Sequence, residues 1–176
     1  PWYTQTRVER GTDPQKLLPG ARSIIALGMS YLGSQEIDPT SSLRSPNETL
    51  QGKVARYAWG NDYHKVIKKR MKAFVKGISE QLGHSINARF YVDDGPMLDR
   101  AIAQRSGLGW FGKNTNILTS SHGSWIFLSQ VITDLELEPD TPLKKTCGNC
   151  SKCIPACPTQ AIVAPYVIDN KKCISY

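Results

Sequence analysis

Four cysteines in the C-terminal part of the chain have the spacing of ligands to an iron–sulfur cluster. The run is Cys147, Cys150, Cys153 and Cys157-Pro158, with two, two and three residues between successive cysteines. Two intervening residues let the backbone turn tightly, so the first three thiolates can face one cluster. In bacterial two-cluster ferredoxins the fourth cysteine of such a run binds the other cluster. The spacing therefore predicts a ferredoxin-type 4Fe-4S site.

Other roles for these cysteines fit the spacing less well. Structural zinc sites use two separated Cys pairs around a tetrahedral ion, whereas this run has three cysteines at successive short spacings. All 5 cysteines lie between Cys147 and Cys173, and an odd number in one cluster is a poor disulfide framework. A cluster with a purely structural role remains the open alternative to electron transfer.

The number of cysteines limits how many clusters the chain can hold. Two cubane clusters need about eight thiolates, but the sequence has 5 cysteines, of which Cys173 is the last. One cluster held by four of the five is one solution. We favour the other, in which the sequence ends before its second cysteine run is complete, and we expect this chain to hold iron poorly.

Upstream of the cysteines, the hydrophobic pattern predicts strands and helices in turn. The short apolar segment 23–31 predicts a buried strand. Residues 37–52, rich in Ser and broken by Pro, predict a loop. Apolar residues at helical spacing predict a helix over 62–82 that ends at Gly83. Alternation over 88–92 predicts a second strand.

The middle of the chain predicts one more helix and a hairpin. A turn leads into a helix over 97–106, which Gly107 ends. Residues 115–119 and 124–132 predict two strands joined through a loop that contains Gly123. Strands and helices in alternation are typical of an α/β layer domain.

These elements divide the chain into three parts. We expect an α/β domain over 1–135 and an acidic, Pro-broken linker over 136–143. Residues 144–176 then form the N-terminal part of a ferredoxin-like domain.

Composition bears on the partners and the compartment. The 22 Lys and Arg residues exceed the 15 Asp and Glu residues, giving +7. This charge favours a polyanion such as RNA, although a solubilising charge explains it equally well. The sequence has no apolar run long enough to span a bilayer and no visible signal peptide. Both observations favour a reducing cytoplasm.

Seven segments of the chain also occur together, in this order and at similar spacing, in one enzyme family. They are residues 17–23, 57–64, 91–101, 107–114, 123–128, 147–158 and 172–176. With them the chain resembles epoxyqueuosine reductases over nearly its whole length.

The resemblance implies a cobalamin-dependent, iron–sulfur enzyme that completes queuosine in tRNA. It implies a nitroreductase-like, cobalamin-binding α/β domain followed by a two-cluster ferredoxin domain. Two electrons and two protons convert the epoxide of epoxyqueuosine, at the wobble position of the anticodon, to an alkene and water. The implied partners are the tRNA anticodon region and a reduced electron donor of flavodoxin or ferredoxin type, and we expect a monomer.

The resemblance also assigns roles to individual residues. Asp93 is implied as the general acid, a role that requires surroundings that keep its carboxyl group protonated. Without the family, Asp93-Asp94-Gly95-Pro96 would be a turn before a helix. Arg100 is implied to face tRNA, and Cys173 joins the other cysteines as a cluster ligand. Cobalamin contacts are implied at Ala55, Tyr57, Asp93, Lys113, Asn114, Ile117 and Leu128. A surface charge or an ordinary core residue is the alternative for the weaker assignments.

The chain departs from the family pattern at two positions. Many members carry Arg where this chain has Gly11, so the cobalamin contact implied there has no matching side chain. Residue 94 is often small and hydroxylated in relatives, whereas here it is Asp94.

Two other functions remain as alternatives. One is a different cobalamin and iron–sulfur reductase acting on a small molecule, similar to a reductive dehalogenase. The other is a ferredoxin-type electron carrier that is not an enzyme, which would leave the α/β domain unexplained.

Overall fold

A three-stranded antiparallel sheet forms the centre of the structure, a computed structural model that describes residues 4–32 and 54–175. Its strands are β1 (Ser23–Ser30), β2 (Ala88–Tyr91) and β5 (Ile126–Thr133), in the order β1-β5-β2. The loop predicted at 37–52 lies outside the described residues. No helix in the described ranges is both long and apolar enough to cross a bilayer.

Strand β5 is the buried strand of this sheet, because it pairs with β1 on one side and β2 on the other. Val131 faces Ile25 in one register and Phe90 in the other. The prediction of a buried strand at 23–31 is therefore wrong in one respect. β1 forms, but in the described part of the chain it pairs with β5 alone, and its residues are half-buried or exposed.

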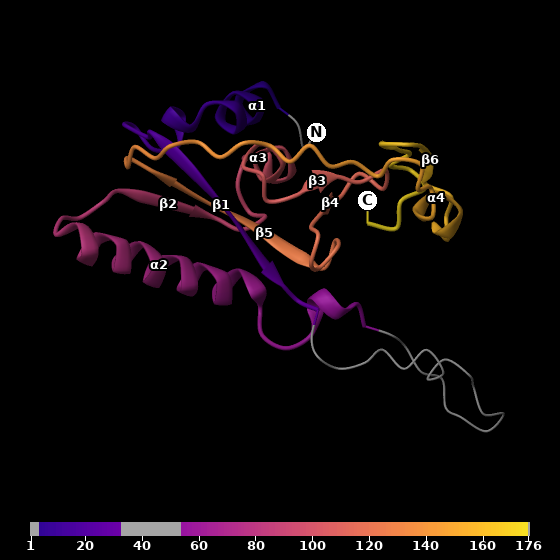
Figure 1. Ribbon diagram of the computed structural model, residues 1–176, viewed down its shortest axis with the longest axis horizontal. Coiled ribbons are helices and arrows are strands. Elements are labelled where there is room, and N and C mark those ends of the chain that lie inside the picture. Colours follow the sequence, from indigo (N-terminus) through magenta and orange to yellow (C-terminus); the bar gives the residue numbers. More distant parts are fainter. Residues whose placement is uncertain (1–3, 33–53, 176) are drawn as a thin grey trace.

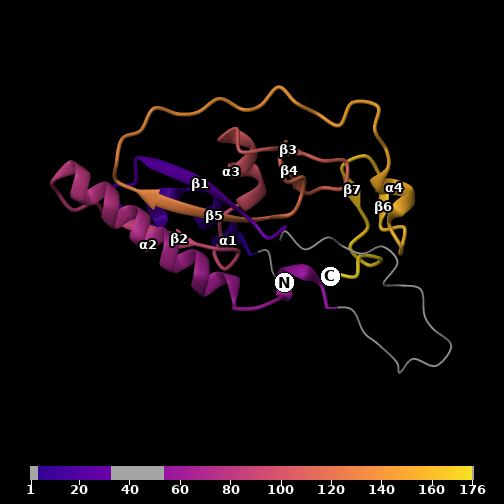
Figure 2. The same cartoon turned by 60° about the horizontal axis from the view of Figure 1, so that its bottom comes forward.

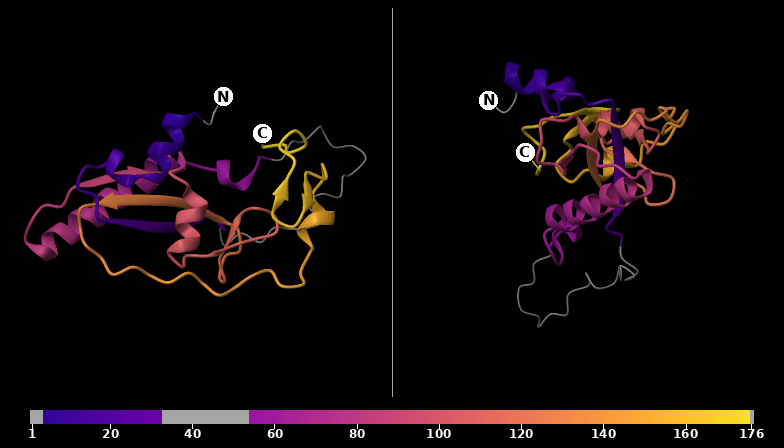
Figure 3. Two further views of the ribbon diagram at one scale, coloured as in Figure 1. Left: turned by 90° about the horizontal axis from the view of Figure 1, so that it is seen from above. Right: turned by 90° about the vertical axis from the view of Figure 1, so that its left-hand side faces the viewer.

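Neighbouring residues of β5 face two different layers of helix, since side chains alternate along a strand. Val131 packs with Ile67 and Met71 of α2 (Tyr63–Leu82) on one side of the sheet. Ile132 packs with Leu17 and Met97 on the other side. That second side carries α1 (Gln5–Thr12), the 3-10 turn η1 (Pro14–Lys16) and α3 (Asp99–Arg105). Figures 1 and 3 show the sheet between α2 and these shorter helices.

Local signals set both ends of α2, as the sequence predicts. The Asp62 side chain caps the first turn by accepting the backbone N–H of His64 at 3.0 Å. The same carboxylate lies 2.9 Å from the His64 ring, and this hydrogen bond holds the pKa of Asp62 below its usual range. Gly83 ends the helix in the left-handed region at φ 73°.

The predicted hairpin over 115–132 is wrong in its pairing. Thr119 and Gly123 do form a bridge across the predicted turn. However, β4 (Ile117–Leu118) pairs with β3 (Trp110–Phe111), whereas β5 joins the central sheet. A strand pattern shows which segments are extended, but the choice of partner depends on contacts distant in sequence.

The segment after β5 is extended and runs along the α/β part of the molecule (Figure 2). Near its start Arg22 pairs with Glu136 at 2.6 Å, and the Leu137 amide donates to the Ser23 hydroxyl at 3.0 Å. The segment leads to α4 (Cys153–Ala156) and to a small hairpin of β6 (Ile162–Ala164) and β7 (Val167–Ile168).

Candidate functional site

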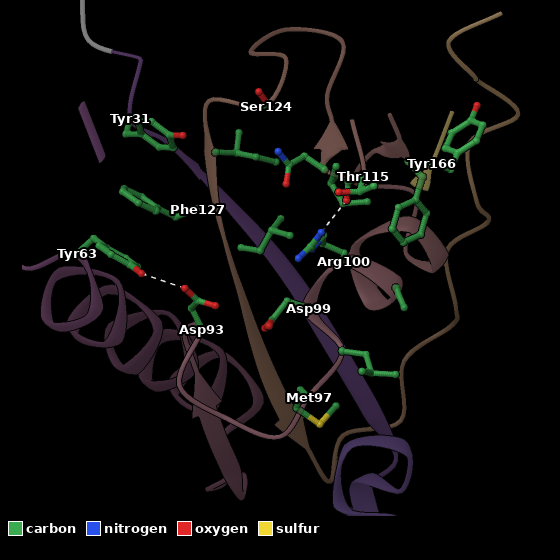
Figure 4. Close-up of a pocket in the computed structure, with 17 residues that line it drawn as sticks. Tyr31, Tyr63, Asp93, Met97, Asp99, Arg100, Thr115, Ser124, Phe127 and Tyr166 are labelled. Atoms are coloured by element: carbon green, nitrogen blue, oxygen red, sulfur yellow. Dashed lines mark hydrogen bonds between the residues drawn. The ribbon is translucent and has the colours of Figure 1, made fainter. Parts of the chain in front are cut away.

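One pocket of about 850 Å³ lies where the α/β part, which holds the central sheet and its helices, meets the segment that contains the five cysteines, residues 147–173. We call this second part the cysteine-containing segment. It is lined by the β2–α3 loop, α3, β5, the β3–β4 region and the β6–β7 turn (Figure 4). Four of the residues singled out in the sequence line this single pocket: Asp93, Arg100, Ile117 and Leu128. Apolar walls and a few converging polar groups are typical of a small-molecule site.

Asp93 enters this pocket from a strained loop position and has one defined partner. It takes the left-handed conformation at φ 57°, which non-glycine residues rarely adopt. The Tyr63 hydroxyl donates a hydrogen bond to Asp93 Oδ2 at 3.1 Å (Figure 4). Desolvation, followed by the charge of Asp93, raises the pKa of Tyr63 to about 12. Tyr63 is therefore a neutral hydrogen-bond donor at physiological pH.

The ring of Tyr63 is fixed by stacking. Phe127 of β5 lies parallel to it, with the ring centroids 4.1 Å apart and the planes inclined by 4°. Tyr63 is the first residue of α2, so the helix that packs on the sheet also sets the position of the Asp93 partner.

The next residue, Asp94, is not among the residues that line the pocket, and it anchors the loop. Its Oδ1 accepts the Val92 amide at 2.9 Å, and its Oδ2 pairs with Lys68 of α2. Partial burial alone would raise the pKa of Asp94, but the hydrogen bonds from Lys68 and Val92 outweigh burial and lower it. A third anchor is Arg7 of α1, which donates to the Gly95 carbonyl at 2.8 Å.

Gly11 supports the same loop from the other side. It is buried, and a Cβ atom there would lie 2.3 Å from the carbonyl oxygen of Pro96. The Arg that the resemblance leads one to expect at this place would therefore not fit against the loop as this chain folds it.

We predict that Gly11→Ala lowers the free energy of unfolding by about 1–3 kcal/mol, because the added methyl group must displace the backbone at Pro96. Thermal unfolding of the two proteins measures the change. Gly77→Ala is the matched control. A Cβ at Gly77 meets no neighbour within 4 Å, and Ala in mid-helix should stabilise by about 0.5–1 kcal/mol. Equal stability of wild type and Gly11→Ala would contradict the tight contact.

Arg100 lies on α3 at the pocket but is already engaged. Its Nη1 donates to the Thr115 carbonyl at 2.7 Å, and Thr115 has a left-handed φ of 67°. This bond connects α3 to the β3–β4 turn across the pocket (Figure 4). The role of Arg100 toward tRNA stays a prediction.

Lys113 and Asn114 support the turn before β4. Lys113 Nζ donates to the Gly148 carbonyl at 2.7 Å, and the Lys113 carbonyl accepts the Tyr166 amide at 3.0 Å. Asn114 Oδ1 accepts the Asn116 amide at 3.2 Å. This turn therefore joins the α/β part to the cysteine-containing segment.

The two remaining predicted cobalamin contacts lie near the 3-10 turn η3 (Arg56–Ala58). Ala55 is the residue before this turn and Tyr57 is within it, with 55% of its surface exposed. The structure does not place either among the residues that line the pocket. Cobalamin contacts at Ala55 and Tyr57 stay predictions.

The five cysteines are all free thiols on one short segment. Cys157 Sγ accepts the Ala161 amide at 3.3 Å. Backbone hydrogen bonds, first from Ile162 and then from Ala161, lower the pKa of Cys157 despite some desolvation. This favours the thiolate, the form that binds iron. Over residues 4–32 and 54–175, however, no three His, Cys, Asp or Glu side chains converge as a metal site.

Tyr63, Asp99 and Tyr166 are among the pocket residues that were not singled out from the sequence. Tyr63 and Asp99 stand within matched segments, but only the fold shows that they approach Asp93. Tyr166 comes from the β6–β7 turn, at φ 66°, and brings the cysteine-containing segment to the pocket wall. The left-handed turn residue after Pro165 is not a recognisable sequence signal.

Together these features define a class of protein. It is an iron–sulfur protein whose α/β domain holds a ligand pocket directly beside a segment with cluster-ligand spacing. Residues 11–94 match the family described as epoxyqueuosine reductase QueG, DUF1730, and residues 146–176 match a 4Fe-4S double cluster binding domain.

Known proteins of similar sequence agree. An epoxyqueuosine reductase of Synechocystis is 45% identical over 162 residues, covering 92% of this chain and 53% of the relative. One of Cellulophaga algicola is 43% identical over 175 residues, covering 99% of this chain and 53% of the relative. This chain thus spans about half the length of these curated relatives.

Solved structures agree as well. Epoxyqueuosine reductase from Streptococcus thermophilus superposes with a TM-score of 0.81 at 31% identity, over 98% of this chain and 45% of that one. An epoxyqueuosine reductase with an epoxyqueuosine-modified tRNA-Tyr stem loop gives 0.83 at 36% identity, over 95% and 43%. The Bacillus subtilis enzyme, with its catalytic Asp loop swung out of the active site, gives 0.82 at 35%, over 96% and 43%.

The chain resembles the epoxyqueuosine reductase family in sequence and in fold. The family resemblance, the mixed α/β fold and the 4Fe-4S binding domain predicted from the sequence are confirmed. The division at residues 135 and 143 stays a prediction.

Proposed function

We propose that the protein reduces epoxyqueuosine in tRNA to queuosine, with cobalamin in the pocket and 4Fe-4S clusters on the cysteine-containing segment. The observation that carries this proposal is the pocket itself. It presents Asp93, held by Tyr63, and one of its walls is Tyr166 of the cysteine-containing segment. A proton donor and an electron source thereby meet at one cavity.

Asp93 is the proposed general acid. Opening a carbon–oxygen bond of an epoxide leaves an alkoxide, which needs a proton from a group within hydrogen-bond reach. Asp93 faces the pocket from the β2–α3 loop, and its Oδ2 is oriented by the Tyr63 hydroxyl at 3.1 Å. Its neighbour Asp94 is committed to Lys68, so one carboxyl group serves the pocket and the other holds the loop.

The pocket fits a large ligand with an apolar face. Ile117, Phe127 and Leu128 provide apolar wall, and Ile117 is buried. Ile117 and Leu128 are the residues that would hold cobalamin here. When bound, cobalamin would supply a reduced cobalt centre able to deliver electrons to the epoxide carbon.

The cysteines of this chain would supply most of the ligands to one cluster and fewer to a second. Cys147, Cys150 and Cys153 have the spacing of three ligands to one cluster, and Cys157 has the place of a ligand to the second. Cys173 adds a fifth thiol nearby in sequence. The clusters would supply electrons one at a time.

The proposed partners follow from charge and chemistry. The net charge of +7 suits the anticodon region of tRNA, and reduction requires an electron donor of flavodoxin or ferredoxin type. We expect a monomer acting in the cytoplasm.

Two anaerobic measurements test the proposal. Absorption spectra of the reconstituted full-length protein, with and without added cobalamin, should show iron–sulfur bands and a change on corrinoid binding. The same protein should convert an epoxyqueuosine-containing anticodon stem-loop and leave organohalides unchanged. Failure to bind a corrinoid would favour the alternative of a simple electron carrier. Turnover of organohalides alone would favour the dehalogenase-like alternative.

A further inference from the structure

A second carboxyl group, Asp99, lines the same pocket as Asp93. Asp99 is the first residue of α3, six residues beyond Asp93, and is partly buried, whereas Asp93 is exposed. Figure 4 shows both side chains at the pocket, near the two ends of the β2–α3 connection. The proposed function so far gives Asp99 no role.

The surroundings of Asp99 favour its protonated form. Burial is the largest influence and raises the pKa of Asp99, and the nearby charge of Asp93 raises it further. A hydrogen bond from Gln130 of β5 and the charge of Arg100 on α3 oppose these influences without cancelling them. Asp99 therefore keeps its proton to a higher pH than an exposed Asp does.

Gln130 is suited to both protonation states of Asp99. Its side chain is 1% exposed, and among the described residues its Oε1 is a buried acceptor with no hydrogen-bond partner. The amide can donate N–H to a carboxylate, or after rotation accept the O–H of a carboxylic acid. A buried acceptor without a donor is costly, and a protonated Asp99 is a donor within reach.

The reaction needs a second proton. Converting an epoxide to an alkene breaks two carbon–oxygen bonds, forms one carbon–carbon double bond and releases the oxygen as water. The balance is two electrons, which bound cobalamin and the clusters would supply, and two protons. Asp93 can give one proton, and must then be reprotonated before it can give another.

We propose that Asp99 is the proton reserve of this site, passing its proton to the Asp93 carboxylate so that the oxygen can leave as water. This inference rests on the proposed function. Asp99 acts through Asp93 and is therefore a positioning and proton-supplying residue, while Asp93 alone meets the epoxide oxygen. Gln130 holds Asp99 in place before and after the transfer.

The first test is turnover of the modified stem-loop by Asp99→Asn in the full-length protein. We expect kcat to fall about 10–100-fold, less than for loss of the direct acid, since water can reprotonate Asp93 slowly. Asp99→Glu should recover part of the rate. In Asp99→Asn, but not in wild type, the rate should rise with the concentration of a small weak acid such as imidazolium. Asp140→Asn, in the exposed segment away from the pocket, is the control.

The second test does not depend on activity. Asp99 is protonated in both the folded and unfolded states below about pH 3, well under the ordinary Asp pKa of about 3.9, so wild type and Asp99→Asn should be similarly stable there. As the pH rises through the raised pKa of Asp99, ionisation costs the folded wild type stability that Asp99→Asn keeps. In thermal unfolding, the midpoint temperature of Asp99→Asn should therefore rise relative to that of wild type between acid and neutral pH.

The outcomes separate cleanly. Wild-type turnover in Asp99→Asn would overturn the role of Asp99, and so would a slow variant that shows neither rescue by weak acid nor the pH-dependent gain in stability. Failure of the wild type itself to convert the stem-loop would instead refute the proposed function.

Discussion

Asp93→Asn is expected to lower the rate of epoxide reduction by about 10²–10⁴-fold, the usual contribution of a general acid. Asn has nearly the same shape and can still accept the hydrogen bond that the Tyr63 hydroxyl gives to Asp93 at 3.1 Å. What it lacks is a proton to give to the alkoxide. The anchors of the loop, Asp94 with Lys68 and Arg7 with Gly95, are untouched by this change.

Single-turnover kinetics on the modified stem-loop measure the effect, and corrinoid titration by absorption checks that the pocket is intact. Tyr63→Phe is the graded comparison. It removes the one hydrogen bond that orients Asp93 Oδ2, worth about 0.5–1.5 kcal/mol, so its rate should fall less than that of Asp93→Asn. Near-normal turnover by Asp93→Asn would remove the assignment of the general acid.

Local signals in the sequence predicted the parts of the fold that depend on local interactions. Helix α2 begins and ends as predicted, because Asp62 caps it and Gly83 ends it within the helix's own turns. Its apolar residues, among them Ile67 and Met71, follow helical spacing because they face the sheet.

Strand pairing was not predictable in the same way. Strands β3 and β4 have two residues each, too few to show alternation, and their pairing took Ile117 and Leu118 away from the expected hairpin. The central place of β5 depends on partners about one hundred residues away in β1 and about forty in β2. No periodicity in β5 itself carries that information.

The residues of the site likewise differ in whether the sequence alone could identify them. Asp93 could be singled out because it stands in a segment, 91–101, that resembles the family. Tyr63 is 30 residues away in sequence and meets Asp93 only through the packing of α2 on the sheet. Gly11 shows the converse case. In the sequence Gly11 stands out because it lacks the side chain for an implied cobalamin contact. In the fold it is the residue that leaves room for the Pro96 carbonyl.

Loss of single cysteines is expected to remove one cluster at a time, and with it all turnover. By its spacing Cys150 is expected to face one cluster together with Cys147 and Cys153, whereas Cys157 is expected to bind the other. In the full-length protein Cys150→Ala and Cys157→Ala should therefore each lose about four of about eight irons. The turnover rate of each variant should fall by more than about 100-fold, because the loss of either cluster interrupts the only proposed path for electrons.

Iron and acid-labile sulfide analysis, with electron paramagnetic resonance of the reduced protein, measures which cluster is left. The double variant decides the assignment, because it should lose both clusters if the two cysteines serve different ones. If it loses no more iron than either single variant, the two cysteines share one cluster. Zinc in place of iron and sulfide in the wild type would instead support the structural zinc alternative. Ser151, between Cys150 and Cys153, is the control position, since Ser151→Ala removes no thiolate and should leave the iron content unchanged.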